Sequence, residues 1–556
     1  MVASAGSGKT RVIIERIAYL VETKKVSPSE IACFTFTRRA ANEMKERLEV
    51  RLGRRAHGIF IGTFHAFALR MINRFGEVIG LKSRKVTIYS SLEEDFLLRD
   101  VATEMGILKG KTWKIPKKDV YAVFNTYYAK GTEPAEDNPA YGLFKAFIQR
   151  CRENNSLSFG GLMIGLRLLI PTLSQYLNIN NILVDELQDT DPLQWEIILG
   201  MEARFGAALF VVGDDWQAIY SFRGSCPEYM VQHQDEFDIF KLENNYRSVP
   251  DIVHASNRLI EHNEDRIKKT MVATREQPTN FPGVILFENY DSERIAYLLH
   301  DGESAGVAVL GRNHFLLEKL SRLLDEMGEP HEYIGRTTAL TNSEPFRRFH
   351  AFLKLAVNPY DNFSFLLVKD IIGLSPAKYS EIRVKAAEAG ISHFQQFSRQ
   401  EDYNEFPFPV SKSLANYLIF INDRFPSLSP ESITFIEAWD GDMDTPESVE
   451  DYLNFLALWD VSDELKKDKT EGLQLLTVHA AKGLEWPVVI LAGLNEGILP
   501  SKQSIDADDL ESERRLFYVA MTRARDQLIL TSRPELEEKN ERVYESPKSR
   551  FIEEAL

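Results

Sequence analysis

The stretch ASAGSGKT at residues 3–10 runs directly into an amphipathic helical pattern over residues 11–22. Small residues and glycines allow backbone N–H groups to wrap around phosphate oxygens, and the start of the following helix adds a favourable dipole. Lys9 is placed to reach the β and γ phosphates of a nucleoside triphosphate, and the Thr10 hydroxyl is placed to bind Mg²⁺. The usual first glycine of this pattern is replaced by Ala3. The predicted phosphate-binding loop comprises Ala5, Gly6, Ser7, Gly8, Lys9 and Thr10.

Two acidic residues, Asp185 and Glu186, follow the apolar run at residues 181–184. The end of a strand delivers adjacent side chains to one edge of a sheet, where α/β folds bind their ligands. Asp185 suits the Mg²⁺ shell, and Glu186 suits activation of an attacking water. Gln217 follows the next apolar strand and would sense the γ-phosphate or orient that water, unless it is simply a polar turn residue. Together with the phosphate loop, these residues indicate a hydrolase.

Short apolar runs alternate with helical patterns, which favours parallel sheets built from strand–helix–strand units. We expect strands at residues 31–36, 182–185, 209–212, 284–287, 307–310, 473–478, 488–491 and 527–531. We expect helices at residues 11–22, 38–52, 66–75, 250–262, 343–357 and 511–522. Two regions, 81–165 and 341–465, lose the strand rhythm. The sequence thus predicts an α/β protein with two parallel-sheet cores, each interrupted by a mostly helical insertion.

The chain has 556 residues, of which 44% are hydrophobic and 27% are charged. This balance is typical of a globular protein, and at roughly 100–200 residues per domain the length predicts about three to five domains. The three cysteines are too few and too widely spaced for a disulfide framework or a common zinc pattern, which indicates a reducing compartment. No apolar run approaches the ~20 residues that span a bilayer, and residues 1–10 lack the pattern of a secretory signal. A cytoplasmic location is therefore expected.

The net charge of −16 argues, at face value, against a nucleic-acid partner. The charge is unevenly distributed, however: residues 1–130 hold 24 Lys and Arg against 13 Asp and Glu, whereas the rest of the chain holds 42 against 69. Phosphate binding depends on the local field, so the basic front of the chain is compatible with nucleic acid. The lysine cluster KGKTWKIPKK at residues 109–118 is placed to touch a duplex, with a solvated loop as the alternative.

Further blocks follow ASAGSGKT in a fixed order: FTFTRRAANEM, GTFHAFAL, LVDELQD, VGDDWQAIYSFRG, ENNYRS, TVHAAKGLEW and ERRLFYVAMTRAR. They run from residue 3 to residue 525, which is nearly the whole chain. Their set and order resemble those of Rep/UvrD-type superfamily 1 DNA helicases, and GDDWQAIY is similar to the helicase IV branch. The resemblance implies a DNA-stimulated enzyme with ATP and Mg²⁺ that unwinds duplex, moves 3′ to 5′ on single-stranded DNA and acts in processes such as DNA repair.

The resemblance also implies two RecA-like core domains, each with a helical insertion. The four parts would span residues 1–80 with 166–250 for the first core, 81–165 for its insertion, 251–340 with 466–556 for the second core, and 341–465 for its insertion. The second insertion is reduced compared with the usual subdomain of this family.

Nucleotide contacts are implied at four further positions. In ENNYRS, Tyr246 would stack on the adenine and Arg247 would contact the γ-phosphate. In VAMTRAR, Arg523 would be an arginine finger from the second core, a role worth about 10³–10⁵ in rate in related ATPases. Glu485 in AKGLEW would bind the ribose. Arginines arriving from opposite sides make hydrolysis depend on domain closure, although a surface salt bridge is the alternative for each arginine taken alone.

A motor on a single strand needs aromatic stacking faces, each worth roughly 1–3 kcal/mol per base, beside contacts to phosphate. The resemblance places the following residues on the DNA side of the cores: Phe36, Arg38, Phe64, His65, Tyr220, Phe222, Arg223 and His479. Rings that follow strands are also common in hydrophobic cores, so packing is the alternative for each ring. The expected partners are single-stranded DNA and junctions of single-stranded with duplex DNA, and the sequence specifies no accessory protein.

The family carries an upstream strand and a glutamine that reads adenine before the phosphate loop. Here only Met1 and Val2 precede Ala3. The upstream strand normally lies inside the sheet, so its absence would expose backbone groups and apolar faces. We therefore expect a truncated or misassigned reading of a longer protein. The alternative function is a catalytically impaired DNA-binding remnant, or a fragment lacking the adenine-reading segment.

Overall fold

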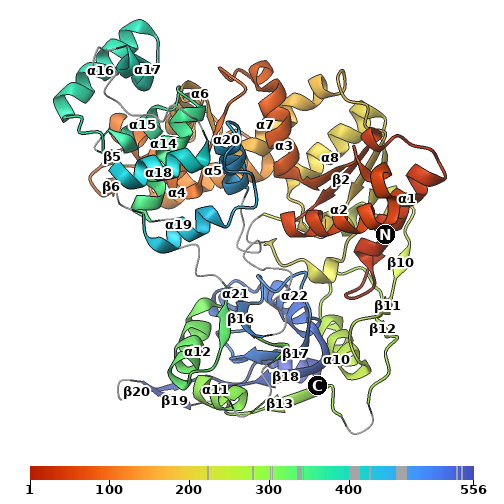
Figure 1. Cartoon of the computed structure of the whole chain (residues 1–556). Helices are drawn as coiled ribbons and strands as arrows, with labels where there is room; N and C mark the ends of the chain where they lie inside the picture. The colour runs from red at the N-terminus through yellow and green to blue at the C-terminus, as the bar shows by residue number, and fades with distance from the viewer. Residues whose placement is uncertain are drawn as a thin grey trace.

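The computed structural model contains two large parallel β-sheets, each covered by helices on both faces, and two helical insertions (Figure 1). It describes residues 1–221, 224–278, 281–300, 302, 305–334, 341, 343–369, 371–399, 413–424, 428–458, 472–533, 536–539 and 542–556. Within these ranges, no helix combines the length and the apolar character that a membrane crossing requires.

The first sheet has four parallel strands in the order β3 (Phe60–Thr63), β2 (Ile31–Thr35), β8 (Asn181–Val184) and β9 (Ala208–Val211). Alternate residues of a strand point to opposite faces of its sheet. Cys33 therefore packs with the helices of one face and Phe34 with those of the other. The first face is covered by α1 (Lys9–Glu22) and α2 (Arg38–Leu52), and the second by α3 (Phe64–Phe75), α7 (Phe159–Leu173) and α8 (Pro192–Phe205).

The main-chain groups of Val2 and Ala3 are paired within the first core. They form β1 (Val2–Ala3), which runs parallel to β10 (Lys241–Leu242), and Val2 also bridges to Gly213 beyond β9. The Ala3 N–H donates to the Gly213 carbonyl at 2.8 Å. The expectation that this part of the sheet exposes backbone groups and apolar faces is therefore wrong for Val2 and Ala3, which are 5% and 0% exposed.

The second sheet has six parallel strands. Their order is β13 (Val284–Phe287), β18 (Ala524–Thr531), β17 (Trp486–Ala492), β14 (Val307–Gly311), β16 (Leu473–Thr477) and β15 (His331–Tyr333). One face packs on α11 (Ser292–His300) and α12 (His314–Met327), and the other packs on α10 (Pro250–Glu261), α22 (Leu510–Met521) and α23 (Arg550–Ala555).

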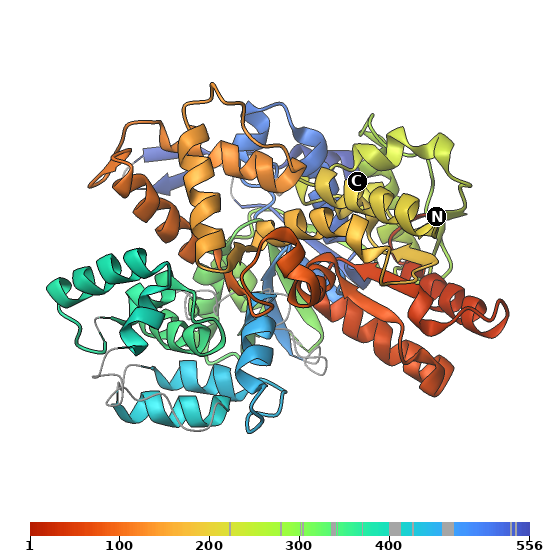
Figure 2. The ribbon, with the colours of Figure 1, turned by 90° about the horizontal axis from the view of Figure 1, so that it is seen from above.

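The two insertions lie against each other, on the side of the molecule away from the N-terminus (Figure 2). The first contains α4 (Ser91–Glu104), α5 (Lys117–Lys130) and α6 (Tyr141–Glu153), with the strand pairs β4 (Thr87–Tyr89)–β7 (Ser156–Ser158) and β5 (Leu108–Lys109)–β6 (Thr112–Trp113). The second contains α14 (Glu344–Val357), α15 (Asn362–Val368), α16 (Pro376–Ala389), α17 (His393–Ser398), α18 (Leu414–Arg424), α19 (Pro430–Glu437) and α20 (Ser448–Ala457). Between them, Asn358 Nδ2 donates to Thr87 Oγ1 at 2.9 Å and the Tyr89 hydroxyl donates to Asp361 Oδ1 at 2.5 Å.

The predicted α/β class with two parallel sheets is confirmed, and every strand and helix expected from the sequence is present. The ends differ by at most three residues. Helix α3, for example, begins at Phe64 rather than Ala66, because the Thr63 hydroxyl caps it by accepting the Ala66 N–H at 3.1 Å. The short strand pairs of the first insertion were not expected from the sequence pattern.

Candidate nucleotide-binding site and DNA face

The predicted phosphate-binding loop joins β1 to α1. Gly6 and Gly8 have φ of 64° and 85°, in the left-handed region that favours glycine. A Cβ on Gly6 would lie 2.8 Å from the Cβ of Arg247, so this turn has no space for a side chain. Within the described part of the chain, the buried hydroxyls of Ser4 and Ser7 have no hydrogen-bond partner. Unpaired hydroxyls beside the start of a helix are suited to phosphate oxygens.

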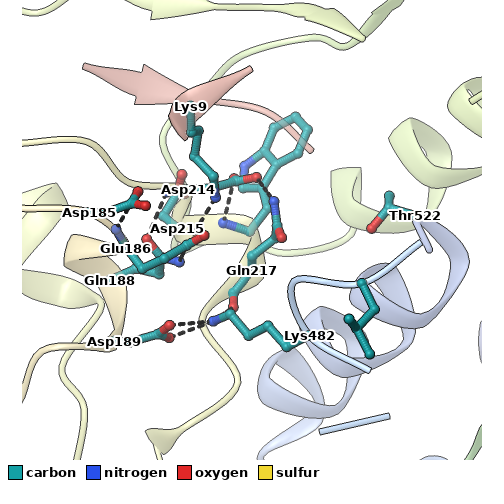
Figure 3. A network of polar contacts seen from close by, with 12 residues as sticks. Lys9, Asp185, Glu186, Gln188, Asp189, Asp214, Asp215, Gln217, Lys482 and Thr522 are labelled. Carbon is teal, nitrogen blue, oxygen red and sulfur yellow. Dashed lines mark hydrogen bonds and ion pairs between the residues drawn. The ribbon is translucent and has the colours of Figure 1, made fainter. Parts of the chain in front are cut away.

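The Lys9 side chain points from this loop toward the two acidic residues that follow β8, and its Nζ donates to Glu186 Oε2 at 2.9 Å (Figure 3). Burial lowers the pKa of Lys9, but the nearby carboxylates, led by Glu186, outweigh burial and raise it. Burial raises the pKa of Glu186, but Lys9 and Lys482 hold that pKa below its ordinary value. Burial and the charge of Glu186 both raise the pKa of Asp185. The neighbouring ammonium groups of Lys9 and Lys482 therefore favour the ionised form of Glu186.

The residues predicted to hold Mg²⁺, Thr10 and Asp185, lie at the start of α1 and directly after β8. A hydroxyl and a carboxylate are oxygen ligands of the kind that Mg²⁺ prefers, so the donor set fits the ion. The neighbouring Glu186 has φ of 54°, which is uncommon for a residue other than glycine. Gln188 Nε2 also donates to Glu186 Oε2, so the backbone and a side chain both fix that carboxylate.

Gln217 lies where the two cores meet. Its Nε2 donates to Asp214 Oδ2 at 2.5 Å, and its Oε1 accepts from Arg523 Nη2 at 3.0 Å. Arg523 is carried by the second core and is only 2% exposed, and its Nε donates to the Val519 carbonyl at 2.9 Å. Burial, together with the charge of Arg247, lowers the pKa of Arg523 to about 9. The structure thus brings Gln217 and Arg523 together from opposite cores.

Arg247 lies beside the phosphate loop and also contacts the second core. Its Nε donates to Glu485 Oε2 at 2.5 Å, and its Nη1 donates to the Thr522 carbonyl at 2.9 Å. The Tyr246 N–H donates to the Gly6 carbonyl at 2.9 Å, while the residue as a whole is 61% exposed. Tyr246 is therefore held next to the loop through its main chain and is largely exposed.

A contact between the cores that the sequence did not indicate joins Lys482 to Asp189. Lys482 Nζ donates to the two oxygens of Asp189 at 2.7 and 2.5 Å and to the Gln217 carbonyl at 2.8 Å (Figure 3). Burial raises the pKa of Asp189 to about 6, against the opposing effect of Lys482. Both residues belong to conspicuous blocks, LVDELQD and TVHAAKGLEW, but a single sequence carries no signal that positions so distant meet in space.

Three of the predicted DNA contacts form one cluster. The rings of Phe36 and Tyr220 stack at 4.8 Å with an interplanar angle of 23°, and the Tyr220 ring lies 6.2 Å from that of His479. The Tyr220 hydroxyl donates to the His479 carbonyl at 3.5 Å. Lys482 Nζ lies 4.9 Å from the centre of the Tyr220 ring, so this cluster adjoins the contact between Lys482 and Asp189.

The other predicted DNA contacts lie elsewhere. Phe64 is a correction: it stacks on Phe34 at 4.5 Å within the core and is only 6% exposed, because its position at the start of α3 turns the ring onto the sheet. His65 stacks on Phe159 at 3.9 Å, and burial lowers its pKa to about 4. Arg38 Nη1 donates to the Phe455 carbonyl of α20 at 3.0 Å. The remaining two positions, Phe222 and Arg223, lie outside the described residues.

A phosphate loop in a core with one parallel sheet that meets an arginine, Arg523, carried by a second such core defines a two-core P-loop nucleoside triphosphatase. The model of the UvrD/REP helicase N-terminal domain matches residues 1–238, and that of the UvrD-like helicase C-terminal domain matches residues 240–414 and 433–535. The chain belongs to the UvrD/REP helicase family.

Curated relatives extend over the same range. The chain is 29% identical to the ATP-dependent DNA helicase PcrA of Bacillus subtilis, an alignment that covers 100% of this chain and 83% of the relative. It is 29% identical to the ATP-dependent DNA helicase Rep of Salmonella typhimurium, over 99% of this chain and 91% of the relative. It is 28% identical to a probable DNA helicase II homologue of Rickettsia felis, over 100% of this chain and 93% of the relative.

Proposed function

We propose that this ATP-dependent DNA helicase moves along single-stranded DNA from 3′ to 5′ and separates the duplex ahead of it. The observation that carries the coupling is the hydrogen bond of 3.0 Å between Gln217 of one core and Arg523 of the other. Groups that must arrive from both cores make hydrolysis depend on their closure, and closure changes the grip on the strand. The direction of movement rests on family membership.

The nucleotide is held, in this proposal, by the loop from Ala5 to Thr10, with the adenine on Tyr246 and the ribose at Glu485. Lys9, Arg247 and Arg523 bring positive charge to the phosphates, where loose phosphoryl transfer is catalysed mainly by position and charge. Mg²⁺ bound by Thr10 and Asp185 would neutralise charge that develops on the phosphate oxygens. Glu186, which is ionised, accepts a proton from the attacking water, and Gln217 orients that water or senses the γ-phosphate.

The strand runs, in this proposal, over the cluster of Phe36, Tyr220 and His479, with Arg38 and His65 as further contacts outside that cluster. Base stacking on aromatic rings is tolerant of sequence, as a translocating motor requires. The load is modest, because a duplex step costs a mean of about 1.4 kcal/mol of stacking.

We also propose the division into two cores and two insertions at residues 80, 165, 250, 340 and 465.

The rival function, a catalytically impaired DNA-binding remnant, is less well supported. A remnant has no need to retain a buried and mutually oriented set of catalytic groups. Here Lys9 pairs with Glu186, and Gln217 pairs with Arg523, in one buried region between the cores. We therefore do not favour the remnant.

Replacement Lys9→Ala tests the assignment. Hydrolysis of ATP should be abolished, because the only ammonium on the phosphate loop is removed, while binding of a single-stranded oligonucleotide should persist. The matched control is Arg11→Ala, which removes an exposed cation from the same helix and should leave turnover unchanged. Retained turnover in Lys9→Ala would contradict the assigned site. Partial duplexes with a 3′ or a 5′ tail test the direction, and unwinding of only the 5′-tailed substrate would contradict it.

A further inference from the structure

A buried lysine outside the predicted site, Lys269, lies between the two cores. It belongs to the segment 262–271, which connects α10 to β12 (Val272–Ala273). Its Nζ pairs with Asp214 Oδ1 at 2.6 Å and with Asp215 Oδ1 at 2.6 Å, and its side chain is 0% exposed. It also lies 4.6 Å from the centre of the Trp216 ring. One ammonium group thus contacts three consecutive residues of the loop that carries Gln217.

The oxygens of both aspartates are fully engaged. Asp214 Oδ1 also accepts the Trp216 N–H at 3.2 Å, and Asp214 Oδ2 accepts Gln217 Nε2 at 2.5 Å. Asp215 Oδ2 accepts the Ile267 N–H at 2.8 Å. Two adjacent buried carboxylates repel each other unless a cation compensates both. Lys269 therefore holds in place the Asp214 carboxylate that accepts the Gln217 amide.

The segment that carries Lys269 is fastened to the second core. Arg514 Nη1 donates to Asn263 Oδ1 at 2.6 Å, and Arg515 Nη2 donates to the Asp265 carbonyl at 3.1 Å. Both arginines lie in α22, which ends at Met521, directly before Thr522 and Arg523. The two ends of the Gln217 carboxamide are therefore held from the same part of the second core. The Nε2 end is held through Asp214 and Lys269, and the Oε1 end is held by Arg523.

We infer that Lys269 is a positioning residue for ATP hydrolysis, which orients Gln217 through Asp214 and ties that orientation to the second core. The inference deepens the proposed function and rests on the role given there to Gln217. A residue that acts only through another has no effect once that other residue is removed. This property separates positioning by Lys269 from a general contribution of a buried ion pair to stability.

The test is a double-mutant cycle of Lys269→Met with Gln217→Ala, in which DNA-stimulated ATP turnover is measured in steady state. We expect Lys269→Met to lower kcat by at least about tenfold with KM for ATP changed less than about twofold, which is the pattern of a group that acts in the transition state. The double variant should be no slower than Gln217→Ala. The matched control is Lys354→Met, which removes another buried lysine paired with a carboxylate, Glu93, inside the insertions and should leave kcat unchanged.

Lys269→Met leaves two buried carboxylates without their cation, so a second variant guards against loss of folding. Lys269→Met combined with Asp215→Asn removes one charge of each sign and should show the same low kcat. A wild-type kcat in either folded variant would overturn the inference. It would also be overturned if Lys269→Met lowered kcat by the same factor in the Gln217→Ala background as in the wild type. If Gln217→Ala lowered kcat and Lys269→Met did not, this inference alone would be overturned. Wild-type turnover in Gln217→Ala would overturn the proposed site as well.

Discussion

Lys9 and Glu186 neutralise each other in this structure, at 2.9 Å, and each shifts the pKa of the other toward the charged form. Phosphate oxygens compete with Glu186 for the Lys9 ammonium, because both are anionic acceptors of the same cation. In the proposed mechanism, binding of the nucleotide therefore releases Glu186 from one partner while Lys482 still contributes to the low pKa of Glu186. Glu186, the proposed base, is thus available once the nucleotide is in place.

At the residue scale, replacement Glu186→Gln should preserve ATP binding and lower hydrolysis. The amide cannot accept the proton of the attacking water, and loss of a positioned base typically costs about 10²–10⁴ in rate. Single-turnover hydrolysis with bound oligonucleotide measures the chemical step, and equilibrium binding of ATP shows whether affinity for the nucleotide is preserved. Glu196→Gln, an exposed residue on α8, is the matched control. A rate within about twofold of the wild type would exclude Glu186 as the base.

At the element scale, the sequence predicted the strands and helices whose apolar pattern recurs within their own residues. It missed the elements whose formation depends on contacts with distant parts of the chain. The apolar strand at 31–35 and the helix at 38–52 follow from the pattern of their own residues. The short pair β4–β7 has only three residues in each strand, and its pairing depends on packing that brings together distant parts of the chain. For the same reason Phe64 could be placed after a strand but not assigned to the core rather than to the DNA face.

The hairpin β5–β6 and the segment that follows it carry exposed lysines. Replacing these lysines tests the contact with duplex DNA that the sequence suggested. Replacement of Lys109, Lys111 and Lys114 by Gln should weaken binding to a junction with duplex DNA while leaving binding to single-stranded DNA unchanged. The slope of log K against log salt should fall by about 0.9 for each phosphate that these lysines neutralise in the wild type. Lys24→Gln with Lys25→Gln, in an exposed turn after α1, is the control. If binding to the junction and binding to single-stranded DNA weakened equally, these lysines would not contact the duplex.

Helix α14 carries a buried histidine, His350, whose environment predicts that the second insertion loses stability in acid. Burial lowers the pKa of His350 to about 3, and the ring contacts the Tyr452 hydroxyl at 2.9 Å and the Phe346 carbonyl at 2.6 Å. The unfolded chain takes up a proton near the ordinary pKa of about 6.5 while the folded chain does not, so stability is full above that pH and is lost as the pH falls.

Between pH 6.5 and pH 5, the His350 contribution to stability should fall by about 1.6 kcal/mol. His350→Gln retains a hydrogen-bond donor and an acceptor but does not titrate. Between the same two pH values, the second insertion of this variant should therefore lose less stability than that of the wild type, by about the His350 contribution. Hydrogen exchange of the α14 and α20 amides at the two pH values measures the difference. His57→Gln, at an exposed position, is the control and should behave as the wild type. An identical acid loss in His350→Gln would exclude His350 as the cause.

At the scale of the whole molecule, the candidate nucleotide site and the proposed DNA face share residues at the junction of the cores. The blocks that make up this junction were recognisable in the sequence. Residue types suggested the roles proposed for Lys9 and Glu186, and the family resemblance suggested the role proposed for Arg523. Their mutual geometry was not predictable, because it depends on how the two sheets are placed. Lys482 illustrates this point, since its Nζ contacts Asp189 and the Gln217 carbonyl on one side and the Tyr220 ring on the other.

Lys482 therefore lies between Gln217, which is proposed to orient the water, and the Tyr220 ring, which is proposed to stack on a base. Replacement Lys482→Met should leave most basal ATP turnover intact and reduce its stimulation by single-stranded DNA at least about fivefold, the lower limit of a typical coupling between two sites. The reason is that Asp189, buried and without its cation, becomes neutral, and the DNA face loses its link to Gln217. Turnover with and without oligonucleotide measures the ratio, and Lys354→Met is the control for removal of a buried lysine. A stimulation ratio equal to that of the wild type would show that the DNA signal reaches the nucleotide by another route.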